Sequence, residues 1–488
     1  MSQRPVGRQP GRIALAVLCL SLAGPARAGY VLLSWNDLGM HCMNRIHANL
    51  SILPPYNNVD AQLIRQGSVG VDPLIVTKGF TIEYSIPGNT YSVGKTDFWS
   101  YDVQLFGVDL PDNIGLTGKG LTGTLDWSGD HFRAEGIPIT PYTDATPTIE
   151  SPYQQGRLIA RDGDGTAVAI SNPVLPVSAE INCLGSGCHS SESGILNDHP
   201  DEAGFDPNQR PILCASCHAD PALGTPGIEE AGYFSFRMHD QHKFMDETTP
   251  GITGCYKCHP GPAARCLRGA MNTDHGLICQ DCHGDMATVA TSIEHQGRVP
   301  WVNEPACRTC HTAQYGEPVG VLYKLAKGHG GVMCAGCHNS THAEFPSREV
   351  NDNANMIDLQ GHAGTLSNCS VCHGTTPAGA GPHGFVPSEV VEAELLGKAE
   401  SLHVYPSPAQ SGCRIELAGA SGGEGRLLVF DAQGRTLRLL PTESGSNGTR
   451  VANWDGADQS GRRVAPGVYF IRWQDGRRSA AAKVVLRR

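Results

Sequence analysis

The sequence predicts a multidomain chain with three folded parts. Strand-like runs separated by Gly, Pro and Asn fill residues 29–180, which predicts a β-sandwich-like domain. Residues 181–390 hold seven short cysteine and histidine motifs, and we expect short helices and little regular structure there. Strand patterns return in residues 403–488 and predict a small antiparallel β-sandwich, joined through a connector at 391–402.

Residues 1–28 have the pattern of an export signal. Basic residues precede an apolar run at 13–23, and Ala26 and Ala28 provide the small residues of a cleavage site. The run is too short to span a membrane, and no other run is longer. We therefore expect an exported mature chain without a transmembrane segment, located outside the cell or on its surface; the alternative is the periplasm.

The strand runs of the first part are short and rich in β-branched and aromatic residues. Between the last two, Asp162-Gly-Asp-Gly165 predicts a hairpin turn. The predicted strands cover residues 30–35, 74–86, 101–106, 121–127, 137–140, 157–160 and 167–170.

In the middle part, a cysteine pair is followed at once by a histidine seven times. Six copies are Cys-x-x-Cys-His, and the first copy has four residues between its cysteines. The cysteines are Cys183 and Cys188, Cys214 and Cys217, Cys255 and Cys258, Cys279 and Cys282, Cys307 and Cys310, Cys334 and Cys337, and Cys369 and Cys372. The histidines are His189, His218, His259, His283, His311, His338 and His373.

This spacing is typical of c-type haem attachment. Each cysteine can bond one vinyl group of the haem, and the histidine then lies beneath the iron as its proximal ligand. Zinc sites and disulfides also use paired cysteines, but neither requires a histidine after every second cysteine. We therefore expect seven covalently bound haem c groups, packed so closely that the porphyrins form much of the interior.

The same part of the chain supplies candidates for the second axial ligand. Nine histidines lie outside the motifs: His199, His239, His242, His275, His295, His329, His342, His362 and His383. His239 and His242 would share one face of a helix over 233–245, so they could serve two haems. Weaker candidates are Met238, Met245, Met271 and Met333.

Iron with two histidine ligands has no open position and a lower potential than iron with His/Met ligation. The sequence therefore predicts electron transfer through seven mostly bis-histidine haems, to or from an extracellular acceptor or donor and redox partner proteins, without catalytic residues. The alternatives are a multihaem reductase of a small nitrogen or sulfur oxyanion, which needs a vacant axial position, and a subunit of a polymeric cytochrome wire.

Charge restricts the partners further. The whole chain has a formal net charge of −11, although residues 1–28 and 421–488 are net positive. The part between them is therefore strongly acidic, which argues against binding to nucleic acid and favours cationic partners.

A second cluster lies in the first part. Its side chains are of the kind that bind copper, although a structural loop or a histidine reaching a haem would explain it as well. It contains Met40, His41, Cys42, Met43 and His47.

Isolated residues outside these clusters have simpler expectations. We expect His131 and His403 at the surface. Cys266 either pairs with Cys42 or Cys413 or stays free.

The motifs with their surplus histidines resemble the multihaem c-type cytochromes of anaerobic and metal-respiring bacteria. Trp35-Asn-Asp-Leu-Gly-Met-His-Cys-Met43 and Leu105-Phe-Gly-Val-Asp-Leu-Pro111 resemble the haem-free N-terminal region of a group of exported multihaem cytochromes.

The tail resembles the immunoglobulin-like sorting domains of the type IX secretion pathway, which are related to the Ig-like domain of the flagellar hook-capping protein. The matching segments are 404–408, 427–434, 453–456, 461–470 and 483–488. The resemblance implies that the secretion machinery carries the chain across the outer membrane to the cell surface. An ordinary adhesive Ig-like domain is the alternative.

Overall fold

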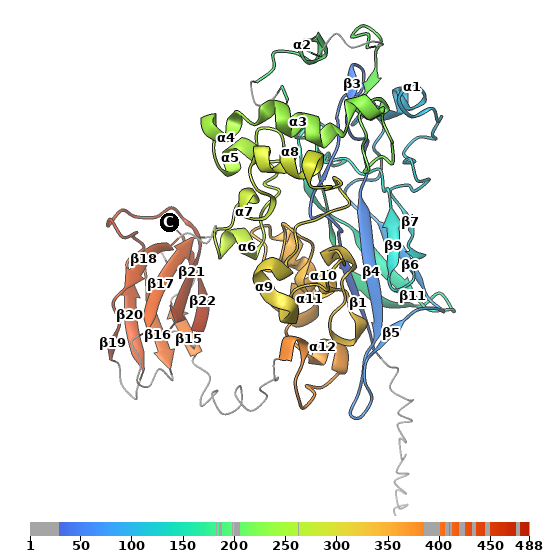
Figure 1. The fold of residues 1–488 in the computed structure, drawn as a ribbon. Coiled ribbons are helices and arrows are strands. Elements are labelled where there is room, and N and C mark those ends of the chain that lie inside the picture. Colours follow the sequence, from blue (N-terminus) through green and yellow to red (C-terminus); the bar gives the residue numbers. More distant parts are fainter. Residues whose placement is uncertain are drawn as a thin grey trace, which may run out of the picture. The chain divides into compact units, whose positions relative to one another are not determined.

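The computed structural model describes two compact units, residues 1–385 and 386–488 (Figure 1). Described residues run from 29 to 487 with gaps at 182, 185–187, 198, 200–204, 262, 385–400, 406–408, 410–411, 419–424, 432–435, 445–448 and 475–478. For 401, 403, 468, 474, 479–481 and 483 only the backbone is described. The expected export signal, most of the connector and the side chain of His403 thus lie outside the described part.

The first unit begins with three sheets of mostly antiparallel strands. Their strand orders are β1-β4-β9-β8 with β5 beside β4, then β12-β11-β6-β7, then β10-β13-β2, in which β2 runs parallel to β13. A short parallel pair, β3 and β14, is added. The strands are β1 Tyr30–Trp35, β2 His41–Cys42, β3 Leu50–Ser51, β4 Asn58–Arg65, β5 Leu74–Val76, β6 Thr81–Ser85, β7 Gly123–Thr124, β8 Asp126–Trp127, β9 Phe132–Glu135, β10 Tyr153–Gln155, β11 Arg157–Arg161, β12 Ala167–Ser171, β13 Val174–Ser178 and β14 Ile212–Leu213.

Strands β1 and β4 are buried on both faces. Leu32 and Leu63 on one face join the core shared with the second sheet. Leu33 and Trp35 on the other face pack against the cysteine–histidine segment. A strand buried on both faces reads as a continuous apolar run, which is the pattern of β1.

Strand β4 departs from this pattern, which is why the sequence did not predict it. Its core-facing residues alternate with Asn58, Asp60 and Gln62, which are buried although they are polar. Gln62 contacts the cysteine–histidine segment directly. Its side-chain oxygen accepts a hydrogen bond from Met333 N (2.9 Å), and its amide donates to Gly331 O (3.3 Å). Such contacts make residues 29–180 and the cysteine–histidine segment one compact unit.

The rest of the first unit is built from short helices and turns. In Figure 1 the helices from α3 to α12 follow one another along the long strands β1 and β4. The α-helices are α1 Asp102–Phe106, α2 Glu192–Asn197, α3 Phe234–His242, α4 Met245–Thr248, α5 Ile252–Cys255, α6 Ala270–Thr273, α7 Cys279–His283, α8 Met286–His295, α9 Arg308–Tyr315, α10 Cys334–His338, α11 Ala354–Gln360 and α12 Ser370–His373. The 3₁₀ turns are η1 Phe98–Ser100, η2 Cys214–Ser216, η3 Glu229–Ala231, η4 Tyr323–Leu325, η5 His329–Gly331, η6 Asn351–Asn353 and η7 Pro382–Gly384.

Two of the predicted strands are wrong and two are interrupted, since 121–127 breaks into β7 and β8 and 74–86 is divided as well. Residues 101–106 form helix α1, which Gly107 ends in a left-handed conformation with its N–H bonded to Val103 O. Residues 137–140 belong to no strand, and 74–86 breaks into β5 and β6. The predicted hairpin at Asp162 joins β11 and β12.

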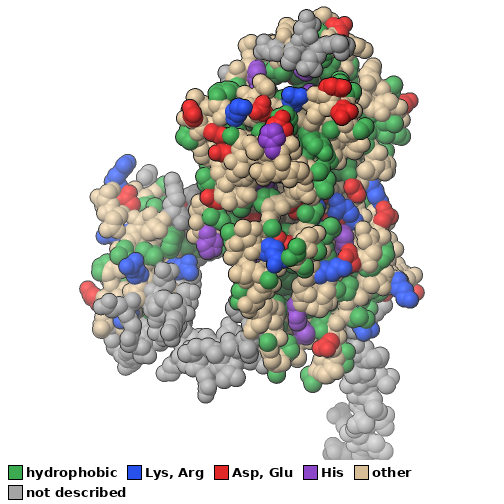
Figure 2. Space-filling model, in the orientation of Figure 1, with side chains coloured by type: hydrophobic (Ala, Val, Ile, Leu, Met, Phe, Trp, Pro, Cys, Tyr) green, Lys and Arg blue, Asp and Glu red, His purple; other side chains and the backbone are tan. Residues whose placement is uncertain are grey.

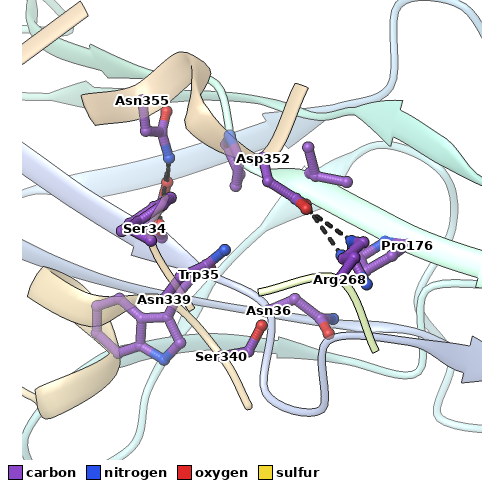
Figure 3. A pocket seen from close by; sticks show the side chains of 12 residues that line it. Ser34, Trp35, Asn36, Pro176, Arg268, Asn339, Ser340, Asp352 and Asn355 are labelled. Atoms are coloured by element: carbon purple, nitrogen blue, oxygen red, sulfur yellow. Dashed lines mark hydrogen bonds and ion pairs between the residues drawn. The ribbon is translucent and has the colours of Figure 1, made fainter. Parts of the chain in front are cut away.

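A buried ion pair inside the cysteine–histidine segment orients an arginine that also binds the loop after β1. Arg268 is 1% exposed, and its guanidinium binds both carboxylate oxygens of Asp352 at 2.6 and 2.9 Å. Its remaining nitrogen donates to Gly39 O in the loop after β1. Figure 3 shows this pair beside a small polar cavity of about 10 Å³, in which Asn355 reaches Ser34. A cavity of this size holds about one water molecule.

The second unit has two antiparallel sheets that enclose one core. The strand orders are β15-β16-β20-β19 and β18-β17-β21-β22, and Leu417 and Trp454 from the first sheet meet Val429 and Trp473 from the second. The expected β-sandwich is therefore present. Its strands are β15 Ser401–Tyr405, β16 Cys413–Ala418, β17 Arg426–Asp431, β18 Thr436–Leu440, β19 Glu443–Ser444, β20 Arg450–Trp454, β21 Gly467–Gln474 and β22 Ser479–Leu486.

Candidate haem-attachment sites

Each motif is closed by the same backbone turn; a motif is named here after its first cysteine. In the Cys214, Cys255, Cys307 and Cys369 motifs the histidine N–H donates to the carbonyl of the first cysteine at 2.9–3.0 Å. The Cys279 and Cys334 motifs are single turns of helix, α7 and α10. One helical turn places the first cysteine, the second cysteine and the histidine on the same side of the backbone.

The long motif reaches the same closure. The N–H of His189 donates to Cys183 O at 3.2 Å, although two more residues separate them than in the other motifs. The longer spacing therefore still leaves the histidine N–H bonded to the first cysteine. All cysteines in the described part of the chain are free of disulfide bonds, so the sulfur atoms are available.

Six of the seven motif histidines face a second histidine ring. In each pair one ring belongs to a motif and the other to the set of nine candidates. The pairs, with ring-centroid separations, are His189 with His242 (6.2 Å), His218 with His199 (6.1 Å), His259 with His239 (6.1 Å), His283 with His342 (6.1 Å), His338 with His383 (6.0 Å) and His373 with His329 (5.9 Å).

These separations suit one metal ion between two imidazoles. A metal–nitrogen bond of about 2 Å on each side, with about 1 Å more from nitrogen to ring centre, puts the centroids about 6 Å apart. The rings are too far apart for direct stacking. Among the described residues, moreover, no three His, Cys, Asp or Glu side chains form a metal-binding group. Two imidazoles with a cysteine pair nearby therefore fit a cofactor that brings its own equatorial ligands, as haem does.

Helix α3 supplies two of the facing rings. His239 and His242 both lie in its last turn, where His239 faces the Cys255 motif and His242 faces the Cys183 motif. Backbone carbonyls orient both rings, since His239 Nδ1 lies 2.7 Å from Ser235 O and His242 Nδ1 2.8 Å from Met238 O. A carbonyl at Nδ1 fixes the tautomer that leaves Nε2 free to bind a metal.

Three electrostatic interactions between cysteines show which motifs are neighbours at the start of the series. Burial and then the nearby Cys183 raise the pKa of Cys214 to about 12. Burial and then Cys183 and Cys188 raise the pKa of Cys258 to about 11. The Cys183 motif therefore lies between the Cys214 and Cys255 motifs, although it comes first in the chain.

The remaining motifs follow in chain order. A hydrogen bond to Cys255 is the largest cause that raises the pKa of Cys279. Burial and then Cys310 raise the pKa of Cys282, and burial and then Cys372 raise that of Cys337 to about 12, with Cys334 a smaller cause. His338 links the Cys334 motif to the Cys307 motif. Its pKa is lowered by burial, then by His383, and then by His311 of the Cys307 motif. The spatial order is thus Cys214, Cys183, Cys255, Cys279, Cys307, Cys334, Cys369.

The Cys307 motif differs from the other six. Its histidine, His311, is exposed and faces no histidine ring in the described part of the chain. The three candidates that remain, His275, His295 and His362, are exposed as well, and none of them faces a motif histidine. Figure 2 shows histidine side chains at several separate points of one face of the molecule.

The predicted copper cluster is dispersed in the fold. Met43 is fully buried in the sheet core, whereas His41 Nε2 binds Asp37 Oδ1 at 2.8 Å. The His47 ring is held by Ser51 Oγ (2.9 Å) and Asn44 O (3.1 Å) and packs edge-on against Phe98. A structural loop therefore describes His41 and His47 better than a copper site does, since each histidine has a partner other than a metal.

His131 is not at the surface, contrary to expectation. It is 5% exposed, because its ring packs near Trp35 and its nitrogens meet Asp60 and Asp130. Burial alone would lower the pKa of His131, but hydrogen bonds to the two carboxylates raise it. This site could not be predicted from the sequence, since its partners come from β4 and from the turn before β9.

Cys266 lies beside a facing histidine. Its sulfur is 3.8 Å from His342 Nδ1, and its carbonyl accepts from Arg268. Cys42 is near enough for Cys266 to be the second cause, after burial, that raises the Cys42 pKa. Cys42, Cys266 and Cys413 are all free thiols in the structure.

Comparison with known proteins adds little. No protein-family model matches the chain, and no curated protein matches it. A solved structure of PorZ, a surface component of the type IX secretion system of Porphyromonas gingivalis, matches at 23% identity over 21% of this chain and 13% of PorZ, with a TM-score of 0.15. A score this low carries no argument about fold or function. No helix among the described residues has the length and apolar character to cross a membrane.

Proposed function

We propose that the protein transfers electrons through a series of seven covalently bound haem c groups. The observation that carries the proposal is the set of six facing histidine pairs at centroid separations of 5.9–6.2 Å, each beside a cysteine pair. Imidazole on both faces of the iron favours reversible one-electron transfer over substrate binding.

The neighbour relations between motifs support a conducting series. Every motif has a neighbouring motif within reach of electrostatic or hydrogen-bond contact. The ring of Tyr315, four residues after His311, lies 5.5 Å from that of His383, which faces the next motif. The protein's contribution to function is then the spacing of the cofactors and the tuning of their potentials.

The proposed extracellular role rests on the sequence. The export signal pattern at 1–28 and the sorting-domain resemblance of 403–488 favour a surface protein that exchanges electrons with an acceptor or donor outside the cell. The test is a deletion of 403–488 in a host with type IX secretion. We expect the shortened chain to remain in the periplasm, and its undiminished appearance at the surface would contradict the sorting role.

The haem proposal is tested on the full chain, exported with haem-maturation machinery present. Intact mass and a pyridine haemochrome assay should count seven haems, and paramagnetic resonance should show at least six low-spin centres. Replacing Cys369 and Cys372 together by Ser should remove one haem. A purified chain with the mass of its bare polypeptide would contradict the proposal.

A further inference from the structure

We propose that the iron held by His311 keeps its other axial position open and binds a small neutral ligand there. This inference rests on the proposed haem content, and it adds a binding site to a protein otherwise built for electron transfer. The ligand class is a small uncharged molecule that coordinates ferrous haem, of the chemical kind represented by carbon monoxide.

Six of the seven motifs share an arrangement that the Cys307 motif lacks among the described residues. Six motif histidines face a second ring at nearly one separation, which shows that the fold aligns imidazoles in pairs wherever it uses them. His311 has the same closed turn as the others, with its N–H bonded to Cys307 O at 2.9 Å. In the described residues, however, no histidine ring lies opposite His311.

In the described part of the chain, none of the three histidines left over faces His311. His295 lies 3.1 Å from Glu294 at the end of α8, and His362 Nδ1 lies 2.9 Å from the backbone oxygen of Ala363. His275 is exposed in the loop between α6 and α7. The histidines of the sheets are also committed: His41 binds Asp37, His47 binds Ser51, and His131 lies between Asp60 and Asp130.

The surroundings of the Cys307 motif are polar as well. Glu317 is 5% exposed, and its buried carboxylate lies beside the Cys307 thiol. Burial and then the charge of Glu317 raise the pKa of the Cys307 thiol to about 12, so this carboxylate lies close to the motif. Glu344, whose Oε2 is also buried and without a partner, acts on the same thiol. Buried polar atoms are normally satisfied, and unsatisfied ones need an explanation.

These two carboxylates decide the class of ligand. Negative charge close to the motif repels a further anion, whereas a neutral molecule meets no such penalty. The position in the series is also informative, because the Cys307 motif lies between the Cys279 and Cys334 motifs. A ligand bound there could exchange electrons with bis-histidine haems on both sides.

The test is carbon monoxide titration of the full, haem-loaded chain after reduction, followed by its absorption spectrum. We expect one of the seven haems to bind carbon monoxide. Replacing Cys307 and Cys310 together by Ser should remove one haem and abolish binding. The matched control, Cys369 and Cys372 replaced by Ser, should remove one haem and leave binding unchanged. His275→Ala, His295→Ala and His362→Ala should each leave it unchanged.

Several outcomes would overturn the inference. Seven low-spin haems without carbon monoxide binding would do so while leaving the electron-transfer proposal intact. Binding that appears only in one of the three single variants would identify that histidine as the missing ligand. Binding lost as protein concentration rises would assign the position to a histidine of a second copy.

The ligand class has its own readout. Azide should bind the oxidised chain weakly, and Glu317→Gln should strengthen azide binding several-fold without changing that of carbon monoxide. Equal azide affinity in both chains would contradict the choice of a neutral ligand.

Discussion

His239 and His242 lie three residues apart on α3, yet their rings face different motif histidines, His259 and His189. One short helix thus joins two candidate haem sites that are far apart in sequence.

We predict that the two histidines act on separate centres. His239→Ala and His242→Ala should each convert one haem from low spin to high spin and raise its potential, because each iron loses a nitrogen ligand. The double variant should affect two haems. Low-temperature paramagnetic resonance counts the centres, and His295→Ala is the control that should change none. A single centre affected by both variants would contradict the pairing.

Gly336, inside the Cys334 motif, should not tolerate a larger side chain. A Cβ placed there would lie 3.3 Å from the Trp35 ring and 3.4 Å from Leu33 Cδ1, so Val would force the motif away from β1. We expect Gly336→Val to lower the free energy of unfolding by about 1–3 kcal/mol, the usual range for overpacking. Urea unfolding followed by circular dichroism measures this. Gly163→Val, where no atom lies within 4 Å, should change it far less.

Removing one partner of the buried ion pair should be costly. In Arg268→Met the carboxylate of Asp352 stays buried without its counter-charge, and such a loss typically destabilises by about 3–5 kcal/mol. The matched comparison is Arg161→Met, which breaks a half-exposed pair with Glu83 and should cost about 1 kcal/mol or less. Equal urea midpoints for the two variants would show that the buried pair contributes no more to stability than the half-exposed one.

Acid should destabilise the sheets through His47. Burial lowers the pKa of His47 to about 4, whereas an unfolded histidine titrates near 6.5. Protons therefore bind the unfolded chain more readily, and stability present at pH 7 is lost as the pH falls from about 6.5 to 4. The full loss is about 3 kcal/mol. Urea unfolding at several pH values should show this slope, and His47→Gln should reduce it.

The attachment motifs could be predicted from the sequence because their chemistry fixes a contiguous spacing. The partners of those motifs could not, since His342 and His383 reach their motif histidines only through the folded backbone. Sheet prediction failed for a related reason. Strand β4 carries Asp60 and Gln62 on the face that packs against the cysteine–histidine segment. Its sequence therefore looks polar, although both residues are buried. The site at His131 was missed because it is assembled from separate strands.

The position of the Cys183 motif has a consequence for biogenesis. Its facing ring, His242, is made only after the Cys214 motif, so the earliest site in translation cannot be completed first. Helix α3 contains no buried side chain and therefore has little to hold it in place beyond its two rings and its packing against α8. A chain that stops before residue 239 would hold the Cys183 motif without its facing ring, so coordination at that site would wait on those few residues.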